Sequence, residues 1–321
     1  MIRALFSRLQ AALLAVWIVL TAVFFLLHLL PGEPGAVFED PRVPQEQRLR
    51  LRAVYGLDQS LLEQYLRWIG GVARGEWGYS FSQHRPVGQI LAESAPRTLL
   101  LSSAALGLEL VLGLTLGVAA AARAGSLFDR ATRVLSLTLW SLPTFWFGLM
   151  LLAAFAVAWP LFPPGAMRSV DAGTLGAGRR AIDILWHLAL PAAAIGLPAA
   201  AATARFVRST VLERLSEPYV QSARARGLSP RRVLWAHALR AGLAPLAQLA
   251  GLSLAALLSG TIAVEVIFAW PGIGRATFDA LVARDYPLLL ASTALSAAFV
   301  VAGSLLAEAL QAWFDPRLRD A

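Results

Sequence analysis

The chain has 321 residues, of which 57% are hydrophobic and only 15% are charged, with a mean hydropathy of +0.61. Soluble domains carry about a quarter charged residues, and here the apolar surplus gathers in runs of about twenty residues, the length that crosses a bilayer. The net charge of +8 comes from 28 arginines without a lysine; because most of these flank the apolar runs, they indicate membrane orientation and argue against nucleic-acid binding.

Six apolar segments predict six transmembrane helices, and hence an all-α, polytopic membrane protein. They cover residues 9–30, 98–122, 134–158, 184–207, 246–268 and 288–313. The first segment is too long for the core of a signal peptide and ends in LLPGEPG without a small-residue cleavage site, so we expect it to remain as an anchor. No fixed-period repeat or low-complexity linker interrupts the chain, which predicts one membrane domain over residues 1–321.

The distribution of arginine predicts which side each loop faces. If the N-terminus is inside, fifteen arginines lie on the inner side and five in the short outer loops. The other eight fall in the outer loop of residues 31–97, which is too long to count in the positive-inside rule. We therefore expect both termini in the cytoplasm.

The outer loop of residues 31–97 is too long for a simple connector. From Gln45 to Trp68 apolar residues recur at helical spacing, with a break at Gly56. This pattern predicts two short helices over the outer face of the bundle. They either only cover that face or form a docking or gating surface.

Glu109 lies near the middle of the second span, where an ionised carboxylate costs several kcal/mol unless it is paired or wetted. Two interpretations stay open: it lines a translocation path, or it is a hydrogen-bonded carboxyl at a helix–helix contact. Ser141, Thr144 and Trp146 belong to the stretch SLPTFWFG at the start of the third span and are further candidates for the path.

Gly107, Gly113 and Gly117 lie near one face of the second span. Small residues let helices approach closely. We expect a tight helix–helix contact there, which in a transporter could also be a sliding surface.

The sequence contains no catalytic constellation. Its four histidines have no metal-ligand spacing, and neither a GxSxG elbow nor a P-loop is present. Without lysine there is no Walker-type ATP site, and without cysteine there is no disulfide or thiolate metal site. We expect no enzymatic activity, no metal and no cofactor bound by this chain itself.

Residues 209–245 form a strongly basic segment between two apolar spans. Val220–Arg226 and Arg231–Arg240 are predicted to be helical, and Gly227 between them can adopt a left-handed turn. Ser229, followed by a proline, suits the N-cap of the second helix. The segment is expected to project from the membrane, either to dock on a cytoplasmic partner or to lie against anionic lipid headgroups.

The sequence Tyr219-Val-Gln-Ser-Ala-Arg-Ala-Arg-Gly227-Leu, followed by His237-Ala-Leu-Arg and Pro245, resembles the coupling loop of ABC importer permeases. More narrowly, it is similar to the dipeptide/oligopeptide/nickel permease family. The likeness extends along the chain through LLPGEP, YGLDQSLLEQYLRWIGGVARGEWGYSF, SLPTFWFG, HLALPA, EVIFAWPGIGR and DPRLR. One departure is Gln221-Ser222-Ala223, where the general ABC-importer motif begins Glu-Ala-Ala.

This resemblance implies the six-helix permease fold of type I ABC importers and, from the long outer loop, a B-type subunit. It implies a transport subunit in a bacterial or archaeal cytoplasmic membrane. Its partners would be a C-type permease, two ATP-binding subunits that hold ATP and Mg, and an extracytoplasmic solute-binding protein. Dipeptides or oligopeptides are the expected cargo, with nickel chelates, glutathione or oligosaccharides as alternatives. A stand-alone secondary carrier is a remoter alternative, because no intramembrane charge pairs are evident.

The resemblance also implies that the segment of residues 219–240 inserts into a groove on an ATP-binding subunit. The residues expected at or near that contact are Tyr219, Ala223, Arg224, Gly227, His237 and Arg240.

Overall fold

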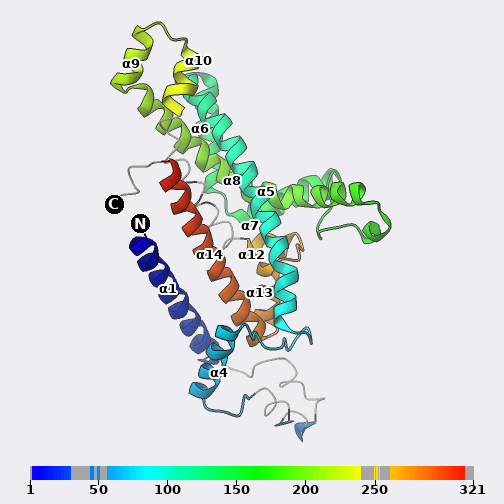
Figure 1. Ribbon diagram of the computed structural model, residues 1–321. Helices are drawn as coiled ribbons and strands as arrows, with labels where there is room; N and C mark the ends of the chain where they lie inside the picture. Colours follow the sequence, from blue (N-terminus) through cyan, green and yellow to red (C-terminus); the bar gives the residue numbers. More distant parts are fainter. Residues whose placement is uncertain are drawn as a thin grey trace. The chain divides into compact units, whose positions relative to one another are not determined.

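The computed structural model describes residues 2–29, 44–46, 49–50, 56–239, 249, 251, 253 and 261–314, with the backbone alone for 2–9, 231, 237–238 and 310–314. Within these ranges the regular secondary structure is helical (Figure 1), apart from an isolated β-bridge between Tyr79 and Pro86, and turns and loops connect the helices. The α-helices are α1 (Ile2–Leu29), α4 (Leu61–Arg74), α5 (Val87–Ala122), α6 (Leu127–Ser141), α7 (Thr144–Leu152), α8 (Ala177–Leu215), α9 (Pro218–Ala225), α10 (Pro230–Arg232), α12 (Ile262–Ile267), α13 (Ile273–Val282) and α14 (Tyr286–Phe314). Two π-helices, η1 (Ala153–Ala158) and η3 (Val233–Leu239), and one 3-10 helix, η2 (Val170–Thr174), complete the set.

Four of the described helices are long and apolar enough to cross a membrane. They are Gln10–Leu29 within α1, α5, α8 and Tyr286–Ala309 within α14. These helices overlap the predicted first, second, fourth and sixth spans, although α5 begins well before the predicted start at residue 98. The predicted fifth span, residues 246–268, lies mostly outside the described residues, so the number six stays a prediction.

The predicted third span, residues 134–158, is not one straight helix. It is a pair, Leu127–Ser141 and Thr144–Ala158, bent by 102°. Leu142 has an extended conformation with ψ 135°, because the ring of the following Pro143 disfavours the helical region for the residue before it. Pro143 then precedes α7 in extended backbone. Counted as one broken span, the pair is a fifth candidate crossing.

The chain forms two compact units. Unit 1 contains Leu99–Trp270 together with Phe299–Ala321, and unit 2 contains Ile2–Thr98 together with Pro271–Ala298. Helices α5 and α14 each contribute residues to both units. The expectation of a single membrane domain stays a prediction.

In unit 1, α5 and α8 approach closely at two glycines. A Cβ added to Gly113 would lie 2.6 Å from the Thr203 side chain, and one added to Gly117 would lie 2.6 Å from the Val207 Cβ. A Cβ added to Gly107 would meet nothing within 4 Å. Two of the three glycines noted in the sequence therefore make the contact, and Gly107 does not.

Unit 2 is organised around aromatic side chains at the end of α1. The Phe24 ring lies 5.3 Å from that of Tyr65 and 5.4 Å from that of Trp68, both on α4. The Tyr286 hydroxyl, at the start of α14, donates a hydrogen bond to the Leu27 carbonyl oxygen over 2.9 Å. This bond joins the C-terminal end of α1 to the N-terminal end of α14.

Helix α4 has a defined cap at each end. The Ser60 hydroxyl accepts a hydrogen bond from the Glu63 N–H, and the Ser60 hydroxyl and N–H donate to the Glu63 carboxylate. These hydrogen bonds lower the pKa of the Glu63 carboxyl. Gly75 ends the helix with φ +77°. Gly56, where the sequence predicts a break between two helices, has φ +70°. Most of the helix predicted before Gly56 lies outside the described residues.

Candidate coupling loop and buried polar contacts

Residues 217–239, named here the coupling loop, form a helical hairpin beyond the C-terminal end of α8 (Figure 1). Glu217 is the N-cap of α9 and Pro218 is its first residue. Proline suits this position because an N–H there would have no hydrogen-bond partner within the helix. Ser229 has the extended backbone of an N-cap before Pro230, although its side chain makes no capping hydrogen bond. The predicted second helix is present as the short α10 followed by the π-helix η3, a rare geometry that often occurs at functional sites.

The turn of the coupling loop is a Schellman motif centred on Gly227. The Gly227 N–H donates to the Arg224 carbonyl over 2.9 Å, and the Leu228 N–H donates to the Ala223 carbonyl over 3.3 Å. Gly227 has φ +78°, and a Cβ added there would meet nothing within 4 Å. The position therefore favours glycine for its backbone conformation and not for lack of space.

The hairpin has its own small apolar core. Val220 and Ala223 of α9 and Val233 of η3 are almost completely buried against one another. Leu215, the last residue of α8, and Leu228 of the turn pack against this cluster. The two arms of the coupling loop are therefore held to each other and to the end of α8.

The predicted contact residues fall into different environments. The Tyr219 side chain is 42% exposed, and Arg224 and Gly227 are also exposed on the hairpin surface. Ala223 is completely buried in the hairpin core, so its side chain supports the loop and is not presented at the surface. Only the backbone of His237 is described, within η3, and Arg240 lies outside the described residues.

A second apolar cluster connects the coupling loop to the long helices of unit 1. Val118 and Ala121 of α5 and Val207 and Val211 of α8 form its buried part. Leu234 and Leu239 of η3 pack against it. A displacement of the loop would therefore push directly on the ends of α5 and α8.

Asp129 of α6 forms a buried ion pair with Arg208 of α8. Arg208 Nη2 lies 2.9 Å from Asp129 Oδ2, and the Asp129 side chain is completely buried. The Gly125 N–H also donates to Asp129, and Arg133 lies 3.7 Å away. The spacing of Ser126 and Asp129 is that of an N-cap and the third residue of a helix, so the sequence could have indicated the start of α6. It could not have indicated that Asp129 pairs with an arginine of α8.

Glu109 occupies a junction of three segments of unit 1. Its Oε1 accepts hydrogen bonds from Thr203 Oγ1 of α8 and Ser253 Oγ, each over 2.7 Å. Its Oε2 is buried and has no hydrogen-bond partner among the described residues. The side chain is 1% exposed, so this conformation matches the hydrogen-bonded helix contact foreseen for Glu109 as one of two interpretations.

Ser141, Thr144 and Trp146 surround the bend between α6 and α7, and all three are exposed in this single chain. The Ser141 hydroxyl donates to the Thr138 carbonyl within α6. Just before the bend, the Arg205 guanidinium of α8 lies 4.8 Å from the centre of the Trp140 ring. Polar and aromatic side chains therefore lie together at the bend between α6 and α7.

The grouping of residues closest to hydrolase chemistry is Ser169, Asp183 and His187. The Ser169 hydroxyl donates to Asp183 Oδ1 over 2.6 Å, and His187 Nδ1 lies 3.4 Å from the same oxygen. In a nucleophilic triad the histidine would lie between the other two residues, so this arrangement fastens a loop to α8 instead. Across the described part of the chain, no group of three or more His, Asp or Glu residues could hold a metal ion.

Sequence comparisons agree on one family. Residues 113–320 match the family described as "Binding-protein-dependent transport system inner membrane component", and residues 1–102 match "Binding-prot-dependent transport system membrane comp, N-term". The chain is 35% identical to the oligopeptide transport system permease protein AppB of Bacillus subtilis and 35% identical to the dipeptide transport system permease protein DppB of Escherichia coli. It is 37% identical to the di/tripeptide transport system permease protein DppB of Pseudomonas aeruginosa. Each comparison covers 92% of both chains.

Proposed function

Because the chain belongs to the family of binding-protein-dependent transport system inner membrane components, we propose that it is the B-type permease subunit of an ATP-driven peptide importer. The observation that carries this proposal is the coupling loop. It is a rigid hairpin with exposed Tyr219 and Arg224, built on the end of a long membrane helix and packed against a second one.

In this mechanism the hairpin docks into a groove of a cytoplasmic ATP-binding subunit. ATP and Mg are held by the two ATP-binding subunits, and their closure moves the docked loop. Because η3 packs on α5 and α8, the movement is transmitted to the helices that enclose the path. Transport then follows from two global states that differ in the position of the loop and in the side to which the path opens.

The family likeness supports three kinds of partner: a second, C-type permease, the two ATP-binding subunits and an extracytoplasmic solute-binding protein. In the proposed orientation both termini and the coupling loop face the cytoplasm. The excess of arginine on that side of the sequence supports this orientation.

Peptides are the proposed cargo because the relatives are named as oligopeptide, dipeptide and di/tripeptide permeases. Nickel chelates, glutathione and oligosaccharides are the alternative cargoes of the same importer class. Ser141, Thr144 and Trp146 at the α6–α7 bend are proposed to line the path. Glu109 joins the path only in a conformation in which Thr203 and Ser253 have moved away from it.

Affinity purification of the tagged chain from its own membranes in mild detergent, followed by mass spectrometry, tests the assembly. A P-loop ATPase and a second permease are expected to purify with it. Recovery of the chain alone, under conditions that preserve other complexes of that membrane, would favour a stand-alone carrier. Uptake of a labelled dipeptide, compared with labelled glutathione and nickel in cells lacking this chain, then tests the cargo.

A further inference from the structure

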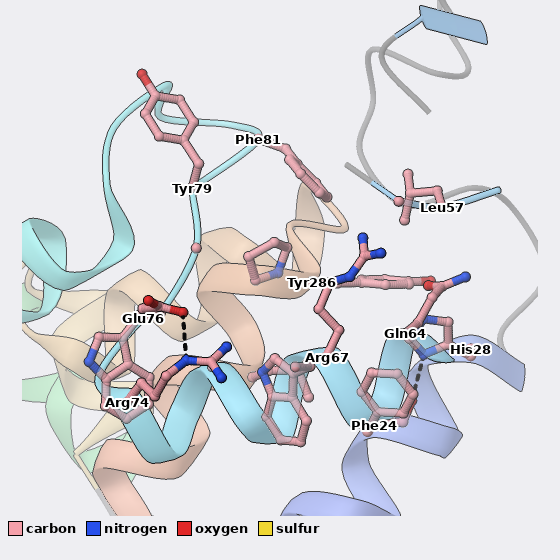
Figure 2. Close-up of a pocket in the computed structure, with 17 residues that line it drawn as sticks. Phe24, His28, Leu57, Gln64, Arg67, Arg74, Glu76, Tyr79, Phe81 and Tyr286 are labelled. Carbon is pink, nitrogen blue, oxygen red and sulfur yellow. Dashed lines mark hydrogen bonds and ion pairs between the residues drawn. The ribbon is translucent and has the colours of Figure 1, made fainter. Parts of the chain in front are cut away.

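Unit 2 contains a cavity of about 370 Å³ between α1, α4, the loop after α4 and the start of α14 (Figure 2). This volume is in the range of sites that bind small ligands. The cavity is half open, and its lining is mostly apolar. The side chains that matter here are Phe24, Arg67, Trp68, Tyr286 and Leu290.

The apolar wall of the cavity comes from two membrane helices. Phe24 belongs to α1, and Tyr286 and Leu290 belong to α14, both of which are long and apolar enough to cross a bilayer. The hydrogen bond from Tyr286 to the Leu27 carbonyl joins the last turn of α1 to the first turn of α14. The two helices therefore reach the same membrane surface at this point, which places the cavity at the level of the lipid headgroups.

The cavity lining also includes one cation, Arg67, that forms no ion pair with a described residue. Arg67 rises from α4 toward Tyr286, and it has no hydrogen bond or ion pair with any described residue (Figure 2). The Glu63 carboxylate, one turn earlier on α4, interacts electrostatically with Arg67, but its hydrogen bonds go to Ser60. The other charged residues of the lining, Arg74 and Glu76, are paired with each other over 3.1 Å. The charged lining residues Arg67, Arg74 and Glu76 therefore sum to one positive charge.

We propose that this cavity binds an anionic phospholipid with a monoanionic phosphodiester headgroup, such as phosphatidylglycerol. The phosphate would lie against Arg67, and the upper part of an acyl chain would lie along Phe24, Trp68 and Leu290. A single negative charge complements the single excess positive charge of the lining, and the apolar wall matches the acyl chain. An inorganic anion would leave that wall empty. The bound lipid would tie α4 to α1 and α14 and is independent of the transported cargo.

The test is native mass spectrometry of the full chain, purified with its partners from vesicles that contain phosphatidylglycerol and phosphatidylcholine in equal amounts. We expect the wild type to retain one phosphatidylglycerol more than Arg67→Gln, with an apparent affinity about fivefold higher, the effect of one basic residue near an anionic headgroup. Arg130→Gln removes the same charge from an exposed position on α6, outside the cavity, and is expected to bind like the wild type.

Arg67→Lys keeps the charge and is expected to retain the bound phosphatidylglycerol, which separates loss of charge from misfolding. Equal retention of lipid by the wild type and Arg67→Gln would overturn the proposal. Displacement of the lipid by inorganic phosphate alone would show a free-anion site and would also overturn it. So would a protein segment from a partner subunit found cross-linked to a photoreactive residue at Trp68.

Discussion

Asp129 of α6 and Arg208 of α8 form an ion pair in which the carboxylate is completely buried and the arginine side chain is 20% exposed. Arg208 directly follows Val207, a buried member of the cluster through which η3 of the coupling loop contacts α5 and α8. The ion pair therefore fixes α6 to α8 within unit 1.

Removing one partner of this pair should destabilise the protein strongly. Asp129→Ala leaves the Arg208 charge without its counter-ion, and such a loss costs about 3–5 kcal/mol in a buried pair. The midpoint of thermal unfolding in detergent should fall clearly. The matched control is Arg133→Gln: Arg133 also faces Asp129 but is half exposed, so its loss should cost less than about 1 kcal/mol. Equal effects of the two substitutions would show that the buried pair has no special role.

Gly227→Val should abolish uptake while the chain still inserts in the membrane. Valine at φ +78° costs more than the roughly 1–2 kcal/mol typical of L-residues in left-handed backbone, so the hairpin turn should open. Gly227→Asn is the control, because asparagine tolerates this conformation and the site has room for a side chain. Transport should be measured in vesicles at matched amounts of protein. Normal uptake by the valine variant would remove the turn from the coupling mechanism.

Glu109→Gln should retain most transport if Glu109 acts as a hydrogen-bonded helix contact. The amide oxygen can still accept from Thr203 and Ser253, whereas Glu109→Ala leaves both hydroxyls without their acceptor at a cost of about 1–3 kcal/mol. The expected order of stability is therefore wild type, glutamine variant, alanine variant. Loss of uptake in a stable, fully assembled glutamine variant would instead indicate that the carboxyl group itself takes part in transport.

Gly117→Ala should weaken the packing of α5 on α8. The added Cβ would lie 2.6 Å from the Val207 Cβ and 2.7 Å from the Ala204 carbonyl oxygen, and overpacking of this kind costs about 1–3 kcal/mol. Gly107→Ala is the control on the same helix, where a Cβ meets nothing within 4 Å. Stability in detergent and yield of the assembled complex are the measurements. A control variant that is as unstable as Gly117→Ala would contradict the assignment of this contact.

Patterns within a few residues were read correctly from the sequence. The turn at Gly227 and the helix start at Pro230 follow from the local geometry that glycine and proline permit, and both are present. The apolar runs in the sequence coincide with four helices, α1, α5, α8 and α14, that are long and apolar enough to cross a membrane. The ends of these helices were not predictable from hydropathy, because α5 and α8 continue into polar sequence that a water-facing helix tolerates.

Contacts between segments that are distant in the chain could not be predicted from the sequence. The sequence around Asp129 does not indicate that Arg208, on another helix, is its partner. Nor does the sequence around Glu109 indicate that Thr203 and Ser253 donate hydrogen bonds to it. The bend before Pro143 was missed because a continuous apolar run outweighed the conformational restriction that proline places on Leu142. Ala223 shows the same limit, since the position of a small residue in a motif does not tell whether it faces a partner or the core of its own hairpin.

The central claim, that the coupling loop docks on an ATP-binding subunit, is tested most directly by photo-cross-linking in the intact membrane. A photoreactive residue in place of the exposed Tyr219 should cross-link to a P-loop ATPase, and the yield should change when ATP is trapped. The same residue at Val170, which is fully exposed in the loop before α8 and expected on the other side of the membrane, should give no such product. Absence of an ATPase cross-link from position 219 in an assembled, transporting complex would contradict the proposed coupling.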